Sequence, residues 1–386
     1  MTRRLRTAII GCGKVGHTHA LALQQLPQSQ LVAVYDVMLE RAREYAEKYQ
    51  VSAYDNFEKM VKDCGVEAVS ICTPHPLHTE YILRSAQLGV HVISEKPLAS
   101  DLQSCDLAID ACRKNGVKLG VISQRRFYPP VRRMLEAIKA GKIGKPILAS
   151  MIVMGWRSPE YYLMDPWRGK WQSEGGGVMV NQTIHQLDLL QWLMGPIEDL
   201  FGYWDNLNHP TIEVEDTAVA VLRYKSGALG QFLVSNSQKP GFYGKILIHG
   251  SNGASIGAQT EGGSPFVAGV TSAIEPPILD VWTIPGEEHL LAQWQDEDRD
   301  FANTHDSMTY FHQVQIEDFL NSVLENREPL VNGEEARISV ELFTAVYRSQ
   351  RDHKPVQFPV PAEIDQGDYD GRKSFIPLSH KIGLHP

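Results

Sequence analysis

Three glycines near the start of the chain have a spacing suited to chemistry. Gly11, Gly13 and Gly16 follow an apolar run, and a helical stretch begins at Lys14 and Val15. The first glycine suits a tight turn, the second lets the main chain approach a pyrophosphate, and the third lets a helix pack on a strand. The N–H groups of the first helical turn would face the phosphates. The spacing therefore predicts a dinucleotide-binding turn.

An acidic residue, Asp36, ends the next apolar run, which covers residues 31–35. A carboxylate at this place accepts hydrogen bonds from the hydroxyls of an adenosine ribose and repels a 2′-phosphate. Three glycines alone are often only a turn. Together with the strand, the helix and Asp36 they predict binding of NAD, with NADP less favoured.

The segment Glu95-Lys96-Pro97 closes a later predicted strand, beside the place expected for the nicotinamide. A partly desolvated lysine that faces a positively charged ring has its charged form disfavoured. Lys96 is therefore a candidate proton donor or acceptor for an alcohol that is being oxidised. The alternative is a surface lysine, with Pro97 only turning the chain.

A second group of polar residues follows the triple glycine at 175–177. The stretch after it reads as a helix that ends at Gly195, with His185 and Asp188 on one face. A carboxylate that holds an imidazole forms an oriented acid–base unit. Alternatively, Asn181 is a helix N-cap and His185 a hydrogen-bonded histidine between helices. A third metal ligand is not clustered with these residues, so no metal site is expected.

The first part of the chain, up to about residue 125, alternates predicted strands and helices. This order predicts a doubly wound parallel sheet with helices on both faces. We expect strands at 6–10, 31–35, 52–54, 68–72, 91–94 and 118–122. Ligands bind such sheets at the carboxyl ends of the strands. Those ends carry Gly11–Gly16, Asp36, Thr73–His75, Glu95–Pro97 and Ser123–Arg126.

The later part of the chain has long alternating patterns at 146–154, 217–224, 228–235 and 245–249. They predict a large, open antiparallel or mixed sheet covered by helices on one face, in an α+β domain whose other face could bind a second copy. Residues 257–303 have a weak pattern and are expected to form an extended flap or a subunit arm. Helices are expected at 310–325 and 334–350. The expected division is 1–125 for the dinucleotide, 126–360 for substrate and oligomerisation, and 361–386 as a tail.

Composition limits the classes of partner. A chain of 386 residues is expected to form two domains. A net charge of −9 without long like-charge runs argues against nucleic acid or an anionic membrane as partner. Five cysteines without a CxxC pair indicate buried thiols in a reducing compartment. With no apolar stretch long enough for a bilayer, a cytoplasmic protein is expected.

Taken together, these motifs resemble the glucose–fructose oxidoreductase / inositol dehydrogenase / MocA family of nicotinamide-dependent oxidoreductases. The segments that carry the resemblance fall in the family's order: Gly11–Gly16, Cys72–His75, Glu95–Pro97, Gln124–Phe127, 175–195 and 310–319. The resemblance implies a Rossmann domain followed by an α/β domain with a large open sheet. It also implies assembly as homodimers or homotetramers through that sheet.

The resemblance further implies that Lys96 is the catalytic lysine and that His185 is the second acid–base residue, oriented by Asp188. Many members carry an aspartate where this chain has Asn181. An amide cannot exchange protons at neutral pH, so Asn181 is expected to position substrate. Further residues implied at the site are Thr73, Pro74, His75, His78, Glu95 and Gln124 for the cofactor and Arg126, Trp167 and Arg168 for the substrate.

The sequence thus predicts an NAD-dependent dehydrogenase that oxidises a secondary hydroxyl of a sugar or cyclitol. Trp167 and Arg168 look like those of a subgroup that acts on sugars or cyclic polyols, although Arg168 could instead form a salt bridge at the rim. His78 could also be a helix-packing histidine. Two other functions stay open: glycoside cleavage through transient oxidation, and a dinucleotide-binding regulator without catalysis.

Overall fold

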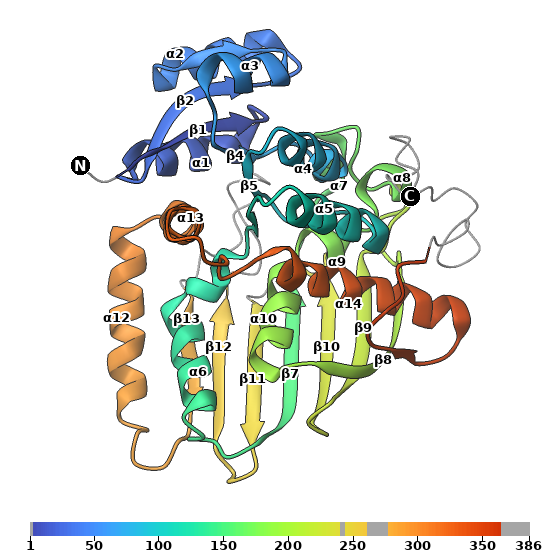
Figure 1. Cartoon of the computed structure of the whole chain (residues 1–386). Helices are drawn as coiled ribbons and strands as arrows, with labels where there is room; N and C mark the ends of the chain where they lie inside the picture. Colours follow the sequence, from blue (N-terminus) through green and yellow to red (C-terminus); the bar gives the residue numbers. More distant parts are fainter. Residues whose placement is uncertain (1–2, 240–243, 261–276, 364–386) are drawn as a thin grey trace. The chain divides into compact units, whose positions relative to one another are not determined.

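The computed structural model describes residues 3–239, 244–260 and 277–363 (Figure 1). These residues form two compact units. Among the described residues, the first contains residues 3–124 together with Ser307–Arg337, and the second contains those of Arg125–Asp306 together with residues 338–363.

The first unit is built on a six-stranded sheet in the order β3-β2-β1-β4-β5-β6. Every neighbouring pair is parallel. The strands are β1 (Leu5–Ile10), β2 (Ser29–Tyr35), β3 (Ser52–Tyr54), β4 (Ala68–Ile71), β5 (His91–Ser94) and β6 (Leu119–Val121). The strand order reverses between β1 and β4, so the doubly wound sheet is confirmed.

Helices connect the strands of this sheet: α1 (Lys14–Gln25), α2 (Leu39–Tyr49), α3 (Phe57–Cys64), α4 (His78–Gln87) and α5 (Leu102–Lys114). A helix from much later in the chain, α13 (Ser307–Leu324), joins them. Its Ile316, Phe319 and Leu320 are buried in one core cluster with Leu23 and Leu26. This burial explains why residues 307–337 group with the first unit, although the sequence division set them in the second domain.

The second unit is built on an eight-stranded mixed sheet in the order β13-β12-β11-β7-β10-β9-β8-β14. Among its described strands, only β7 and β10 pair in parallel. The strands are β7 (Pro146–Met154), β8 (Ile197–Asp205), β9 (Thr217–Tyr224), β10 (Leu229–Ser235), β11 (Gly244–Gly250), β12 (Ser255–Thr260), β13 (Ile278–Trp282) and β14 (Val356–Gln357). The predicted large mixed sheet is confirmed.

One face of this sheet is covered and the other is open. Helix α10 (Ile184–Met194) contacts β7 and β11, and α6 (Pro129–Lys139) contacts β12 and β13. Figure 1 shows both helices, with α14 (Gly333–Asp352), on the same side of the strands. Every second residue of β9 is buried under these helices, and the residues between them are exposed.

Several elements differ from the sequence expectations. Residues 257–303 contain most of β12, β13 and helix α12 (Leu290–Thr304), so an extended flap is wrong for the described part, while a subunit arm stays a prediction; residues 261–276 lie outside the described part. Strand β8 had not been predicted. The helix expected up to Gly195 is broken into α9 (Val178–Asn181) and α10, which follow α7 (Pro159–Leu163) and α8 (Trp171–Glu174). Of the expected tail, residues 364–386 lie outside the described chain.

In the described part of the chain, no helix is both long and apolar enough to cross a membrane.

Candidate functional site

The glycine turn of the first unit has the shape expected of a phosphate cradle. Gly11 has φ +95°, and a Cβ there would lie 2.8 Å from the backbone of Cys72. A Cβ on Gly16 would lie 2.8 Å from the carbonyl oxygen of Gly11. By contrast, nothing lies within 4 Å of a Cβ on Gly13. The first and third glycines are thus required by packing, while the second leaves open space at the start of α1, where the helix offers its free N–H groups.

Asp36 lies beside this turn and stabilises it. Its Oδ2 accepts a hydrogen bond from the backbone N–H of Cys12 at 2.9 Å, and its Oδ1 accepts one from Met38 at 2.9 Å. A carboxylate has about four acceptor sites, so hydroxyls of a ribose can still bind to it. The contact with Cys12 had not been predicted, and the role of Asp36 toward a ribose stays a prediction.

Among the predicted cofactor residues that follow β4 and β6, some are already hydrogen-bonded within the protein and others have a buried polar atom without a partner. His78 is fully buried, and its ring nitrogens lie 2.7 Å from the carbonyl oxygen of Pro97 and 3.1 Å from that of Thr73. It ties the ends of β4 and β5 together. The side-chain oxygens Oγ1 of Thr73 and Oε1 of Gln124 are buried without a hydrogen-bond partner. Buried polar atoms are rarely left unpaired, so these two fit a site that a ligand completes.

The end of β5 is held by a buried network around Glu95. Its Oε1 lies 2.9 Å from Nε2 of His19 on α1 and 3.3 Å from Nε2 of His312 on α13. Its Oε2 accepts a hydrogen bond from the backbone N–H of Lys96 at 3.2 Å. Burial raises the pKa of the Glu95 carboxyl, but the hydrogen bonds from both histidines outweigh it and hold that pKa well below its usual range. The network fixes the backbone at Lys96.

Sequence reasoning missed this network, because His19 and His312 are far from Glu95 in the sequence. Among the described residues, these three form the one group that brings three possible metal-ligand atoms within 4.8 Å of one another. Direct hydrogen bonds already join their facing atoms, and Nδ1 of His312 lies 2.6 Å from the carbonyl oxygen of Met308. We therefore describe the group as a hydrogen-bond network.

In the second unit, Asp188 forms a buried ion pair with Arg126. Its Oδ2 accepts from Nε at 2.8 Å and its Oδ1 from Nη2 at 2.6 Å. The guanidinium lies 5.0 Å from the ring centroid of Trp192. Both partners are almost fully buried, so this bidentate pair anchors α10. Sequence reasoning had assigned Arg126 to the substrate; the predicted action of Asp188 on His185 stays a prediction.

Asn181 ends α9 and is not a helix N-cap, so that alternative is wrong. The N-cap of α10 is Thr183. The amide Nδ2 of Asn181 donates to Oε1 of Glu174 at 2.6 Å and lies 3.4 Å from the hydroxyl of Tyr161. The break between α9 and α10 thus turns Asn181 toward polar partners one turn before His185.

The Tyr161 hydroxyl joins several predicted substrate residues. Arg168 donates to it at 2.6 Å, and Nε2 of Gln182 donates at 3.0 Å. The Arg168 guanidinium also pairs with Asp165 at 2.9 Å and lies 4.5 Å from the ring centroid of Trp167. Arg168 is buried. The salt bridge expected as the alternative role of Arg168 is present in its contact with Asp165, but its other contacts are with Tyr161 and Trp167.

The triple glycine packs against Glu215. A Cβ on Gly177 would lie 1.9 Å from the carbonyl oxygen of Glu215. The Glu215 side chain accepts hydrogen bonds from the backbone N–H groups of Gly177 and Met179 at 2.8 Å and 3.0 Å. Burial raises the pKa of Glu215 to about 7. This contact sets the start of α9 and hence the place of Asn181.

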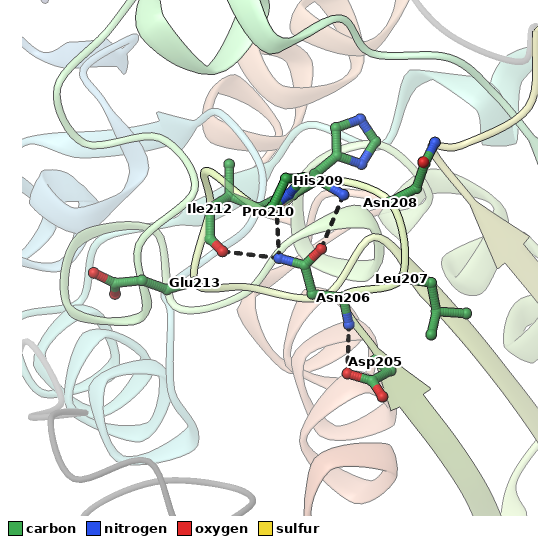
Figure 2. Close-up of a pocket in the computed structure, with 8 residues that line it drawn as sticks. All are labelled: Asp205, Asn206, Leu207, Asn208, His209, Pro210, Ile212 and Glu213. Atoms are coloured by element: carbon green, nitrogen blue, oxygen red, sulfur yellow. Dashed lines mark hydrogen bonds between the residues drawn. The ribbon is translucent and has the colours of Figure 1, made fainter.

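A pocket of about 600 Å³ lies at the loop between β8 and β9 (Figure 2). It is lined by Asp205, Asn206, Leu207, Asn208, His209, Pro210, Ile212 and Glu213. None of the residues predicted for the site lines it, so we assign it no catalytic role. Asn206 closes the loop, because its Nδ2 donates to the carbonyl oxygens of His209 and Ile212 at 2.9 Å and 2.8 Å.

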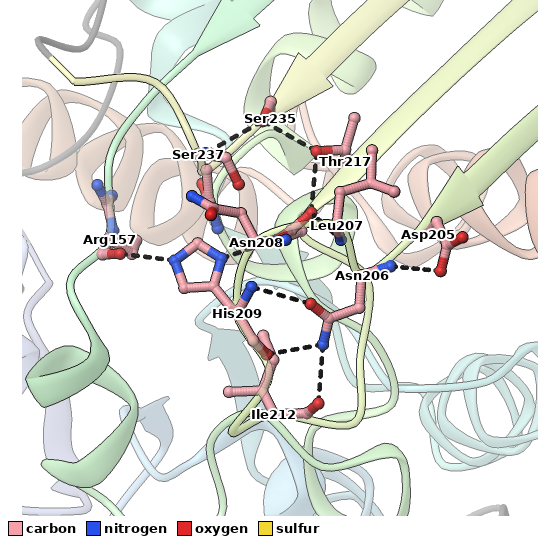
Figure 3. A network of polar contacts seen from close by, with 12 residues as sticks. Arg157, Asp205, Asn206, Leu207, Asn208, His209, Ile212, Thr217, Ser235 and Ser237 are labelled. Carbon is pink, nitrogen blue, oxygen red and sulfur yellow. Dashed lines mark hydrogen bonds and ion pairs between the residues drawn. The ribbon is translucent and has the colours of Figure 1, made fainter.

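His209 connects this loop to the segment after β7 (Figure 3). Its Nδ1 lies 2.8 Å from Oδ2 of Asp216 and its Nε2 lies 2.8 Å from the carbonyl oxygen of Arg157. Burial lowers the pKa of His209, but the bonds to Asp216 and Arg157 outweigh it and raise that pKa above its usual value. Burial would raise the pKa of Asp216, but the hydrogen bonds from His209, Leu207 and Asn208 outweigh it and lower that pKa below its usual value.

Two protein-family models match this chain. A family model described as an oxidoreductase family with an NAD-binding Rossmann fold matches residues 5–123. A second, described as the C-terminal alpha/beta domain of that oxidoreductase family, matches residues 135–358. The resemblance seen in the sequence and the NAD-binding domain are both confirmed.

Individual relatives agree with the family models. The chain is 34% identical to myo-inositol 2-dehydrogenase of Thermotoga maritima over 256 residues, which is 64% of this chain and 74% of the relative. It is 27% identical to scyllo-inositol 2-dehydrogenase (NAD(+)) of Bacillus subtilis, over 93% and 98% of the two chains. The structure of the WlbA dehydrogenase of Bordetella pertussis, solved with NADH and UDP-GlcNAcA, superposes on this chain with a TM-score of 0.82. The two sequences are 28% identical, and the match covers 94% of this chain and 99% of the WlbA chain.

The glycine turn gives a first testable prediction. Gly13→Ala should weaken NAD binding about tenfold or more, because the new methyl group fills the space left for the pyrophosphate. Its φ of −93° suits alanine, so the midpoint of thermal unfolding should stay the same. Gly16→Ala is the matched variant: its Cβ meets backbone, so it should destabilise the protein by about 1–3 kcal/mol. Calorimetric titration with NADH and thermal unfolding measure the two effects. Equal NADH affinity in Gly13→Ala and wild type would contradict the cradle.

The His209–Asp216 pair gives a second prediction. Because the folded-state pKa of His209 is raised, the pair stabilises the fold fully below the pKa of an unfolded histidine, about 6.5. This stability is lost as pH rises through the raised value. At the acid end, it is lost only as pH falls through the lowered pKa of Asp216. NMR titration of the His209 ring should give a midpoint above 6.5 that falls in Asp216→Asn; an unchanged midpoint in that variant would contradict the pairing.

Proposed function

Because the chain belongs to the glucose–fructose oxidoreductase / inositol dehydrogenase / MocA family of oxidoreductases, we propose that it oxidises a secondary hydroxyl of a sugar, sugar derivative or cyclitol with NAD. Two of the relatives are inositol dehydrogenases, and a third was solved with a nucleotide-linked sugar. The observation that carries the proposal is the end of β5, where the buried Glu95 network holds the backbone of a lysine.

Oxidation of a secondary alcohol removes a hydride from carbon and a proton from the hydroxyl. NAD, when bound at the glycine turn, accepts the hydride. We assign the hydroxyl proton to Lys96 and His185, whose side chains can each accept one in their neutral form. Asn181 can hydrogen-bond a substrate hydroxyl but cannot carry its proton, because an amide does not titrate at neutral pH. Its bonds to Glu174 and Tyr161 support a positioning role.

The open face of the second sheet supports the proposal that the protein assembles as a homodimer or homotetramer. Large apolar side chains are exposed on neighbouring strands of that face: Leu148 and Ile152 on β7, Val219 and Val221 on β9, and Leu229 and Leu233 on β10. An apolar patch of this kind on a sheet is typical of a protein interface. We further propose a reducing, cytoplasmic setting, which the five buried free cysteines support.

The role of Lys96 is tested by Lys96→Met. We expect turnover to fall at least about 100-fold, because proton transfer by a positioned side chain is lost. The affinity for NADH should stay within about twofold. Lys62→Met, at an exposed position on α3, is the matched control and should turn over like wild type. The assay is NADH formation with a panel of inositols, aldoses, uronates and glycosides.

The same assay separates the other functions. Near-normal turnover by Lys96→Met would contradict the mechanism. Cleavage of a glycoside without net NADH would point to a glycoside-cleaving enzyme. Binding of a protein partner with no turnover of any compound would point to a regulator.

Assembly is tested by Val221→Arg. Val221 has 57% of its surface exposed on the apolar face, and a charge there should convert the oligomer to a monomer. Leu163→Arg, at an 80% exposed position outside the sheet, should keep the wild-type assembly. Light scattering after size-exclusion chromatography gives the mass. A wild-type monomer, or dissociation by the control alone, would contradict this interface.

A further inference from the structure

Arg157 occupies a fixed position in the second unit, between β7 and α7. Its backbone N–H donates to the carbonyl oxygen of Asn236 at 3.0 Å. Its own carbonyl oxygen accepts a hydrogen bond from Nε2 of His209 at 2.8 Å (Figure 3). These two bonds fix the main chain at Arg157. The residue is only 7% exposed, so its side chain is nearly buried.

The guanidinium of Arg157 lacks a counter-ion among the described residues. Its Nη1 donates to the carbonyl oxygen of Trp156 at 2.8 Å, and the group lies 5.4 Å from the ring centroid of Tyr161. Its Nε is buried without a hydrogen-bond partner. A buried charge without a partner is strongly destabilising, and arginine does not lose its proton in proteins. The side chain therefore has donors left for an anion.

The carboxylates near Arg157 bond to other groups. Asp165 pairs with Arg168, and Asp216 accepts from His209. The oxygens of Glu174 accept from Gly169 and Asn181, and those of Glu215 accept from Gly177 and Met179. None of these side chains neutralises Arg157 directly.

Arg157 and Arg168, a predicted substrate residue, both lie against the aromatic ring of Tyr161. The guanidinium of Arg168 lies 4.6 Å from the centroid of the Tyr161 ring that Arg157 also contacts. The hydroxyl of the same tyrosine lies within 3.4 Å of Asn181 and 3.0 Å of Gln182. Two guanidinium groups thus lie against one tyrosine, beside the amides that precede His185, and of the two only that of Arg168 is paired with a carboxylate among the described residues.

We propose that Arg157 binds a carboxylate or phosphate group of the substrate, which makes the substrate class an acidic sugar derivative. This inference rests on the proposed function, since the hydroxyl to be oxidised belongs to the same molecule. A guanidinium presents its donors as a planar fork that matches the oxygens of either group. The anion would supply the partner that the buried side chain lacks.

The kinetic test compares matched sugars, using NADH formation with glucose, glucuronate, glucose 6-phosphate and UDP-glucuronate. Wild type should favour at least one acidic compound over glucose by about 100-fold in kcat/KM. Arg157→Gln should lose most of that preference through a raised KM for the acidic compound. Arg132→Gln is the matched control, because this arginine also lies over aromatic rings of the second unit. A preference for glucuronate would identify the bound group as a carboxylate, and a preference for glucose 6-phosphate would identify it as a phosphate. Equal use of glucose, or a preference that Arg157→Gln keeps, would overturn the proposal.

A second measurement does not depend on turnover. Thermal unfolding without ligand should give Arg157→Gln a midpoint equal to or above that of wild type, because an unpaired buried charge has been removed. Glucuronate or UDP-glucuronate should raise the midpoint of wild type and leave that of the variant unchanged. A lower midpoint for the unliganded variant would show that the chain itself pairs with Arg157 and would overturn the proposal. If no sugar is oxidised, the proposed dehydrogenase function fails, and these midpoints still decide whether Arg157 binds an acid.

Discussion

The first unit depends on one buried carboxylate. Glu95 accepts hydrogen bonds from a histidine on α1, a histidine on α13 and the backbone of Lys96, and so joins three elements that are distant in the sequence. Breaking such a buried pair by removing one partner typically costs about 3–5 kcal/mol, because the other partner is left charged or unsatisfied. The position of the proposed catalytic lysine is thus tied to the packing of α13 as well as to its own strand.

The second unit uses the same principle with other partners. Asp188 is committed to Arg126, Asp216 to His209, and the Tyr161 hydroxyl to Arg168 and Gln182. The bonds of Tyr161 connect parts of the irregular chain between β7 and α10 to one another, and the bond from His209 to the carbonyl oxygen of Arg157 connects that chain to the loop between β8 and β9. By contrast, the guanidinium of Arg157 has no carboxylate partner among the described residues, and this points to a ligand.

The sequence predicted those features that local pattern determines. The spacing of Gly11, Gly13 and Gly16 was enough to identify the turn, because each glycine answers a separate steric demand. It could not reveal the contact of Asp36 with Cys12 or of Glu95 with His312, since hydrogen bonds between distant segments leave no periodic pattern. Strand β12 was missed because its residues are mostly small or polar and have no clear hydrophobic pattern, while its place in the sheet is set by backbone pairing with β11 and β13. The start of α9 follows from the packing of Gly177 on Glu215, which the helical pattern does not contain.

The central claim is that Lys96 and His185 act on one substrate hydroxyl while NAD lies at the glycine turn. A crystal structure of the protein with NAD and an oxidisable acidic sugar tests it most directly. We predict the pyrophosphate against Gly13 and a single sugar hydroxyl within hydrogen-bond distance of both Nζ of Lys96 and the ring of His185. A sugar whose hydroxyls contact neither side chain, with the nicotinamide directed away from Lys96, would contradict the account.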